Sequence, residues 1–234
     1  MSKNKASSAP HSIGIIMDGN RRFAEKTNCS VAEGHHAGFE TLKKLIHWGG
    51  EAKIRTLYAY AFSTENWHRG PKEIFDLMTL LRNALLDKEV RESGVRVRVI
   101  GNRSRFSGDI QEGIANLERE TAKNKKGTLV LALSYGGREE IVEATREIVR
   151  KKISPEKITE KMFSSALYTS EFRDPDLIIR TGAEGRETRL SNFLPWQSVY
   201  SELFSTKTLW PEFTKKEFFS ILGEYEKCSR KNGK

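Results

Sequence analysis

The chain has 234 residues, 37% of them apolar and 30% charged, and its 40 Lys and Arg against 31 Asp and Glu give a formal charge of +9. This composition excludes wholesale disorder, and the length predicts one or two domains. No apolar run approaches the ~20 residues that span a bilayer, and we expect no secretory signal. Two cysteines are too few for a disulfide framework, so we expect a reduced, cytoplasmic protein. The positive surplus favours an anionic partner: nucleic acid, a lipid surface or a phosphorylated small molecule.

Strand-like and helix-like segments alternate along the chain. Residues 1–11, rich in Ser, Lys and Ala, predict a flexible tail, and residues 12–234 a single domain. Apolar runs predict strands at 13–17, 54–62, 95–100, 129–134 and 177–180. Apolar residues at three-to-four spacing predict helices at 35–48, 72–92, 108–123, 138–151, 156–167 and 214–228. The alternation favours an α/β fold, with a central, mostly parallel sheet flanked by helices.

Polar residues and glycines gather where the predicted strands end. These exits are DGNRR (18–22), STENW (63–67), GNR (101–103), YGGR (135–138) and the stretch 180–192. In open parallel sheets, ligands bind beyond the carboxyl ends of the strands. A rim of glycines, amides, arginines and one early carboxylate suits a phosphorylated ligand with a divalent metal.

The first exit, 18–22, is a candidate site for an anion and its metal. Gly19 lets the backbone approach a ligand, and the free N–H groups of a helix start favour anions. Asp18 could hold Mg²⁺, which prefers one or two carboxylates plus phosphate oxygens, and Arg22 adds a bidentate donor. The alternative is an Asp-Gly turn closed by a surface arginine pair, and local chemistry weighs the two about evenly.

The second exit, 63–69, is dense in polar groups. Asn66 and Arg69 could meet a substrate there. The alternative is a capped turn in which Thr64 or Asn66 starts a helix and Trp67 packs as a lid.

A second anion-binding candidate lies near the last predicted strand and comprises Arg180, Arg186, Arg189 and Ser191. Arginines in a loop more often form a solvated surface, so charge alone leaves this open. Glu202 lies in an otherwise apolar and aromatic segment, 193–210, where a carboxylate needs a cation or a donor. Metal ligation and pairing with an arginine are both open, and the residues alone favour a role that satisfies the core.

Several familiar motifs are absent. The five histidines show no zinc-binding spacing, and G-x₄-G-K-[ST], G-x-G-x-x-G and G-x-S-x-G do not occur, which weighs against nucleoside triphosphatase, dinucleotide-dependent and α/β-hydrolase functions. The wide apolar stripe of 72–92 is typical of a core helix. Its alternative is the wall of a hydrophobic tunnel.

Taken together, the segments resemble the cis-prenyltransferases, the family of undecaprenyl and dehydrodolichyl diphosphate synthases. The matching stretches run in order over most of the chain: HSIGIIMDGN (11–20), GHHAG (34–38), YAFSTENWHR (60–69), YGGR (135–138), DPDLIIRTG (174–182), RLSNFLPWQ (189–197) and LWPEF (209–213). The resemblance implies a Mg²⁺-dependent enzyme that condenses isopentenyl diphosphate with an allylic diphosphate, farnesyl or geranyl, to a Z-configured polyprenyl diphosphate of short to medium length. It also implies an apolar tunnel between sheet and helices and a homodimer. Contact with a membrane surface is compatible with it, and nucleic acid is not an expected partner.

The resemblance carries roles to individual residues. Asp18 matches the residue that handles Mg²⁺ and helps the allylic diphosphate leave, and Asn66 matches the position assigned to proton removal. Substrate-binding positions are Gly19, Asn20, Arg21, Arg22, Phe23 and His35 around the allylic diphosphate, Ser63, Thr64, Glu65, Trp67 and Arg69 around Asn66, and Arg180, Arg189, Leu190 and Ser191 in the pocket for isopentenyl diphosphate. Glu202 matches a metal-binding carboxylate that acts across a dimer interface.

Three of this chain's departures from the family pattern bear on the site and on the product. Val31 stands where an arginine is usual, so one contact to the allylic diphosphate is missing or comes from Arg21 or Lys26. The stretch 183–188 is about three residues longer than usual, and either Glu184 or Glu187 takes the family's glutamate position. The region 72–92 is slightly short, which argues against very long products.

Two other functions remain to be weighed. A non-catalytic subunit of a heteromeric synthase is disfavoured by the intact sequence Asp18-Gly19-Asn20. A basic nucleic-acid-binding module is disfavoured because no familiar module of that kind occurs.

Overall fold

The computed structural model describes residues 9–184 and 189–228, so the first eight residues of the predicted tail lie outside it. The strands are β1 (Ser12–Ile16), β2 (Thr56–Ser63), β3 (Arg96–Ile100), β4 (Thr128–Tyr135), β5 (Leu177–Arg180) and β6 (Glu202–Ser205). The α-helices are α1 (Asn20–Thr27), α2 (Val31–Glu51), α3 (Pro71–Leu86), α4 (Lys88–Glu92), α5 (Gly108–Thr121), α6 (Gly137–Arg150), α7 (Glu160–Ser165) and α8 (Lys215–Lys227). Short 3₁₀ turns are η1 (Thr64–His68), η2 (Arg103–Arg105), η3 (Pro155–Lys157) and η4 (Trp210–Glu212). Within the described ranges no helix has the length and apolarity needed to cross a membrane.

The six strands form one sheet in the order β3-β4-β2-β1-β5-β6, and every neighbouring pair is parallel. The predicted α/β class is therefore confirmed, and all five predicted strands are present. β6 escapes the sequence pattern because it is four residues long, lies at an edge and has only half-buried or exposed side chains. No buried apolar run marks such a strand.

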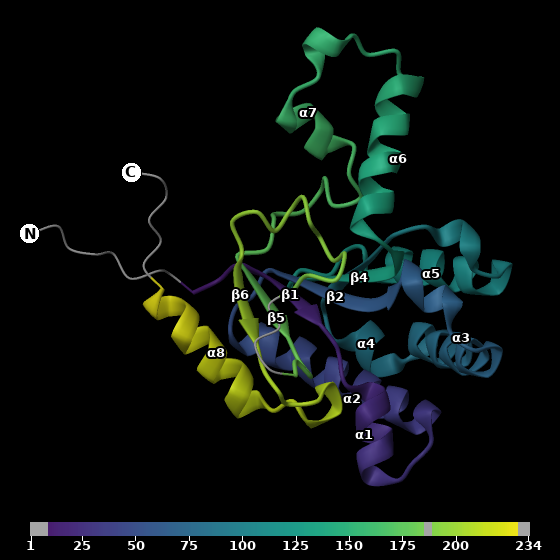
Figure 1. Cartoon of the computed structure of the whole chain (residues 1–234), viewed down its shortest axis with the longest axis vertical. Coiled ribbons are helices and arrows are strands. Elements are labelled where there is room, and N and C mark those ends of the chain that lie inside the picture. Colours follow the sequence, from purple (N-terminus) through teal and green to yellow (C-terminus); the bar gives the residue numbers. More distant parts are fainter. Residues whose placement is uncertain (1–8, 185–188, 229–234) are drawn as a thin grey trace, which may run out of the picture.

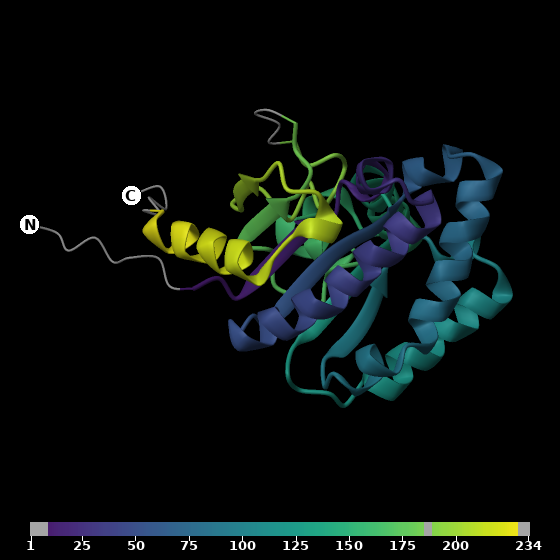
Figure 2. The same ribbon diagram turned by 90° about the horizontal axis from the view of Figure 1, so that it is seen from below.

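The two faces of the sheet are covered differently. One face packs on α2, α5 and α8 through fully buried side chains such as Leu45, Ile114 and Phe218. Figure 2 shows α2 on this face between α8 and the pair α3 and α5. The other face packs on irregular chain that contributes Phe193 and Leu194. α6 and α7 extend away from the sheet (Figure 1).

The region 72–92, predicted as one helix, is two. α3 ends at Leu86, and Asp87 takes an extended conformation and caps α4, with its Oδ1 accepting from the Val90 N–H at 3.0 Å. The prediction was wrong because the apolar stripe continues past a capping aspartate. Leu85 is the one fully buried residue of α3, so the rest of its apolar face is incompletely covered. The predicted helix 156–167 is likewise a 3₁₀ turn, η3, followed by the short α7.

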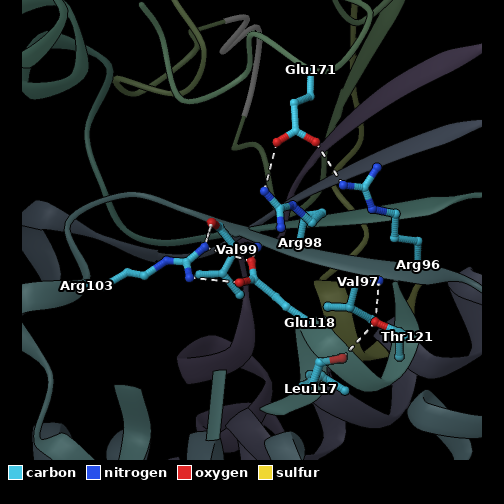
Figure 3. A network of polar contacts seen from close by, with 9 residues as sticks. All are labelled: Arg96, Val97, Arg98, Val99, Arg103, Leu117, Glu118, Thr121 and Glu171. Carbon is cyan, nitrogen blue, oxygen red and sulfur yellow. Dashed lines mark hydrogen bonds and ion pairs between the residues drawn. The ribbon is translucent and has the colours of Figure 1, made fainter. Parts of the chain in front are cut away.

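β3 is an edge strand that neighbouring side chains seal (Figure 3). Thr121 Oγ1 and Glu118 Oε1 from α5 accept from the N–H groups of Val97 and Val99 at 3.0 and 2.8 Å. Glu171 accepts from two arginines of the same strand at 2.8 and 2.9 Å. The outward N–H groups that could template another strand are thereby satisfied.

Candidate active site

A pocket of about 440 Å³ opens where β1, β2 and β5 end. It is lined by nine of the residues that the sequence marked: Asp18, Asn20, His35, Ser63, Glu65, Asn66, Arg69, Arg180 and Ser191. These residues lie far apart in the sequence. They meet because parallel strands carry their following loops to the same edge of the sheet.

Asp18 and Arg180 form an ion pair in this pocket. Neighbouring strands place them, since Ile16 at the end of β1 pairs in register with Arg180. Arg180 Nη2 and Nε lie 2.7 and 3.0 Å from Asp18 Oδ2, and its Nη1 donates to Arg189 O and Ser191 Oγ at 2.7 and 2.9 Å. The guanidinium side chain is 11% exposed and the carboxylate 40%. Among the described residues nothing donates to the second carboxylate oxygen, Oδ1.

The turn after Asp18 requires glycine. Gly19 has a φ of 120°, and a Cβ there would come within 2.9 Å of Leu209 Cα. The Asp18 carbonyl accepts from the Trp210 N–H at 3.0 Å and from Thr181 Oγ1 at 2.9 Å. The turn is thereby fixed, and it starts α1 beside the pocket, where the helix's first N–H groups favour an anion.

His35 faces the pocket as a neutral hydrogen-bond donor. Burial first, and then the charge of Arg69, lower the pKa of His35, so it is neutral at pH 7. Its Nδ1 lies 3.4 Å from Asn20 Nδ2, a donor, which leaves the ring proton on Nε2. Asn20 Oδ1 is buried without a hydrogen-bond partner among the described residues, and the nearest acceptor to the buried His35 Nε2 is Glu73 Oε1, at the long distance of 3.5 Å. Two such weakly satisfied atoms in one pocket are consistent with a polar ligand.

Asn66 and Glu65 are oriented by local hydrogen bonds. Asn66 Oδ1 accepts from the Ser63 N–H at 3.0 Å, which closes the η1 turn. Burial raises the pKa of Glu65, but hydrogen bonds from its own N–H, Asn192, Ser63 and Thr64 outweigh this and lower it overall. Glu65 is therefore an ionised carboxylate at the pocket wall.

A third carboxylate, Glu73 at the start of α3, contacts two cationic or donor groups of the pocket. Its Oε1 lies 2.9 Å from Arg69 Nη1 and 3.5 Å from His35 Nε2. Sequence reasoning did not single it out. The i,i+4 spacing from Arg69 was the available signal.

The remaining predicted binding residues do not line this pocket: Gly19, Arg21, Arg22, Phe23, Thr64, Trp67, Arg189 and Leu190. Arg22 donates to Gly182 O at 2.5 Å and to Glu184 Oε1 at 2.7 Å, so Gly182 and Glu184 are tied to α1. Trp67 packs on two core phenylalanines and donates to Ser134 Oγ at 2.9 Å. These contacts favour the alternative in which Trp67 is a packing residue.

The departures from the family pattern have partial structural answers. Val31 is 36% exposed, and of its two candidate replacements Lys26 is paired with Glu212 at 2.6 Å, whereas Arg21 is exposed. Arg186 and Glu187 lie outside the described residues.

Glu202 does not meet Asp18 within one chain. It starts β6 in register with Leu177, which pairs with Ile13 at the opposite end of β1 from Asp18. At ~3.3 Å per residue this places Glu202 roughly 16 Å from Asp18 along the strand direction alone. In the described part of the chain no three His, Cys, Asp or Glu side chains form a metal-binding group. A metal role for Glu202 stays a prediction that needs a second chain.

An apolar pocket of about 120 Å³ adjoins the polar one. Both pockets are lined by Met17, Asn20, His35, Ala61 and Leu77. The rest of the apolar pocket comes mainly from α2, α3 and β4: Gly38, Phe39, Leu42, Phe62, Met78, Leu80, Leu81, Ala84, Leu131, Leu133 and Trp210. A continuous tunnel remains a prediction.

Two polar residues of the pocket, Tyr60 and Asn192, escaped the sequence assignment. Tyr60 stacks on Phe193 with ring centroids 4.6 Å apart, and burial raises the pKa of its hydroxyl, so it stays protonated. Asn192 has a φ of 66° and contacts Glu65. Both lie in the quoted motifs, but only the folded chain shows that they reach the pocket.

The prenyltransferase family model, described as undecaprenyl diphosphate synthase, matches residues 16–233. The chain belongs to the cis-prenyltransferase family. A tritrans,polycis-undecaprenyl-diphosphate synthase (geranylgeranyl-diphosphate specific) from Thermococcus kodakarensis is 40% identical over 242 residues, covering 100% of this chain and 90% of its own. An isoprenyl transferase from Agrobacterium fabrum is 42% identical over 234 residues, with coverages of 97% and 93%. The crystal structure of lavandulyl diphosphate synthase from Lavandula x intermedia, in complex with dimethylallyl diphosphate, superposes with a TM-score of 0.90 at 32% identity and covers 97% of this chain and 99% of that one.

Proposed function

We propose that this cis-prenyltransferase condenses isopentenyl diphosphate with an allylic diphosphate to a Z-configured polyprenyl diphosphate of short to medium length. The allylic C–O bond breaks, its electron pair leaves with diphosphate, a C–C bond forms to isopentenyl diphosphate, and that substrate loses a proton. One observation carries the proposal: a polar pocket lined by two arginines, two carboxylates and several amide and hydroxyl groups opens directly beside an apolar pocket, and five residues line both. Such a pair of cavities fits substrates with an anionic head and a hydrocarbon body.

The donor set around Asp18 fits Mg²⁺. The carboxylate is partly exposed in the pocket, and its Oδ1 has no partner among the described residues. Mg²⁺ is commonly held by one or two carboxylates plus substrate phosphate oxygens, so Asp18 would hold it, with Glu202 of a second copy as the predicted further ligand. The bound ion supplies positive charge to the departing diphosphate.

The chain's own groups stabilise the same charge. Arg180, Arg69, the neutral His35 donor and the N–H groups at the start of α1 all face or border the pocket. Preorganised donors of this kind stabilise a developing anion without reorganisation. Asn66, held by the Ser63 N–H, is the residue proposed at the proton that isopentenyl diphosphate loses.

The apolar pocket shields the allylic cation and takes the hydrocarbon. Its walls exclude water, which protects the cation from hydrolysis. The apolar pocket holds about 120 Å³. A hydrocarbon chain that needs more volume has to displace the half-covered apolar face of α3, and this cost supports a product of short to medium length. The expected primer is farnesyl or geranyl diphosphate, and the name of the Thermococcus relative adds geranylgeranyl diphosphate as one to test.

A second copy of the chain is the proposed partner. Tyr200 and Val199 are 92% and 69% exposed, Leu203 of edge strand β6 is 39% exposed, and Glu202 lies among them. Sedimentation equilibrium tests this directly: a dimer is expected, and a monomer at micromolar concentration contradicts it. Contact with anionic membranes, also proposed, is tested by flotation with phosphatidylglycerol vesicles.

The deciding experiment uses the purified chain alone. Labelled isopentenyl diphosphate is offered with dimethylallyl, geranyl, farnesyl and geranylgeranyl diphosphates, with Mg²⁺ or with EDTA, and the products are separated by chromatography. Extension of at least one primer, lost in EDTA, is expected. Extension of none overturns the proposal and favours a non-catalytic subunit.

A further inference from the structure

Asn192 joins three segments at the edge of the polar pocket. Its Nδ2 donates to Glu65 Oε1 at 3.0 Å, and its Oδ1 accepts from the Arg138 N–H at 2.9 Å. Its carbonyl accepts from the Gly137 N–H at 2.8 Å. It therefore ties its own loop both to the η1 turn and to the start of α6.

The chemistry of both partners fixes the orientation of this amide. Glu65 is ionised and can only accept, whereas a backbone N–H can only donate. A flipped amide would place its oxygen against the carboxylate and its NH₂ against the N–H. Aspartate, serine or alanine at this position cannot make both contacts, and asparagine makes them at nearly ideal distances.

The backbone around Asn192 is held in an unfavourable conformation. Ser191, Asn192 and Leu194 have φ values of 46°, 66° and 50°, in the left-handed region. Asparagine tolerates that region, but leucine and serine adopt it at a cost that surrounding contacts must offset. Contacts with the surrounding structure must therefore hold this backbone in place, and the hydrogen bonds of Asn192 are among them.

Asn192 connects the Arg180–Ser191 pair on one side of the pocket to the η1 turn on the other. Ser191, next to Asn192, accepts from Arg180, which binds Asp18. Glu65 precedes Asn66. A chain of contacts thus runs from Arg180 through Ser191 and Asn192 to the turn that carries Asn66, all at the pocket wall.

We propose that Asn192 is a positioning residue that sets the distance between the Arg180–Ser191 cradle and the Asn66 turn, and hence the fit of isopentenyl diphosphate. This rests on the proposed function for the identity of the ligand. The allylic side, built from Asp18, Asn20 and His35, has no contact with Asn192 and should be affected far less. The signature is a selective loss of affinity for one of two diphosphate substrates.

The test compares Asn192→Asp and Asn192→Gly with Asn102→Asp. Asn102 makes the same kind of contact, Nδ2 to a glutamate Oε1 at 2.9 Å, but away from the pocket. Asn192→Asp keeps the acceptor for Arg138 and opposes two carboxylates, whereas Asn192→Gly keeps the left-handed backbone and removes the side chain. Both should raise the KM and the calorimetric Kd for isopentenyl diphosphate about tenfold or more, with the allylic KM changed less than about threefold. Asn102→Asp should change none of them by more than about twofold.

Several outcomes overturn this inference. If Asn192→Gly binds isopentenyl diphosphate with wild-type affinity, the Asn192 side chain is not needed and only the left-handed backbone matters. If both substrates lose affinity equally, the variant is generally unfolded and the selective effect is absent. The double variant Glu65→Gln/Asn192→Asp restores one donor and one acceptor and should bind isopentenyl diphosphate at least as tightly as Glu65→Gln alone; additive losses contradict the coupling. Calorimetry with isopentenyl diphosphate alone needs no turnover, so a failure of the proposed reaction in the extension assay remains distinguishable from a failure of this inference.

Discussion

The two adjoining pockets differ in how their walls are built. The polar pocket takes its chemistry from loops at the carboxyl ends of strands, where Asp18, Asn66 and Arg180 are each held by hydrogen bonds. The apolar pocket takes its walls from the middle of α2, α3 and β4, and α3 has one fully buried residue. Under the proposed function this difference is a division of labour: hydrogen-bonded loops would position the diphosphates, and a loosely covered helix face would accommodate the hydrocarbon.

The largest expected effect is on the polar side. Asp18→Ala should lower turnover at least about a hundredfold, because it removes the carboxylate proposed to hold Mg²⁺ beside the leaving diphosphate. Steady-state extension of the preferred primer measures it. The matched control is Asp109→Ala, which breaks another Asp–Arg ion pair, at 2.5 Å on the surface, and should leave turnover within about twofold. Retained turnover in Asp18→Ala moves the metal role to another residue.

On the apolar side a substitution should change the product and not the rate of the first condensation. Met78 lines the apolar pocket from α3 and is half-buried, so Met78→Trp can enter the cavity without a fully packed core around it. We expect products with fewer isoprene units and a first-condensation rate within about threefold. Thr79→Trp, one residue along the same helix on its exposed side, should leave the product distribution unchanged. Unchanged products from Met78→Trp argue that the hydrocarbon lies elsewhere.

The same division explains how far the sequence could predict the molecule. Apolar runs predicted five of the six strands, and their polar exits contain eight of the nine predicted pocket residues, because parallel topology brings the strand exits to one edge of the sheet. The ninth, His35, came from the family resemblance. The stripe of 72–92 could not be assigned, since a helix face looks the same whether it meets core or cavity. Glu73 and Asn192 were missed because their roles come from contacts across more than one segment and, for Asn192, from a positive φ.

Beside His35, which lines both pockets, Glu73 should oppose diphosphate binding. Its carboxylate contacts Arg69 and His35, two groups proposed to bind the diphosphate. Glu73→Gln removes that competing charge, so calorimetry with inorganic pyrophosphate should show a several-fold lower Kd. Glu89→Gln, which breaks a comparable carboxylate–histidine contact to His47 outside both pockets, should not change it. Weaker binding in Glu73→Gln would indicate that the carboxylate positions Arg69 instead.

The smallest effect concerns His35, which lines both pockets. Burial, and next the charge of Arg69, lower the pKa of His35 in the folded protein below the ordinary value of 6.5. Below pH 6.5 the unfolded chain therefore binds the proton that the folded chain resists, so this group's contribution to stability is complete above that pH and is lost as the pH falls through the folded pKa. Urea titrations between pH 7.5 and 5 should show a falling free energy of unfolding whose slope is smaller in His35→Asn. His36→Asn, which alters an exposed neighbour with a 65% exposed side chain, should keep the wild-type slope; an unchanged slope in His35→Asn would place the proton uptake on other groups.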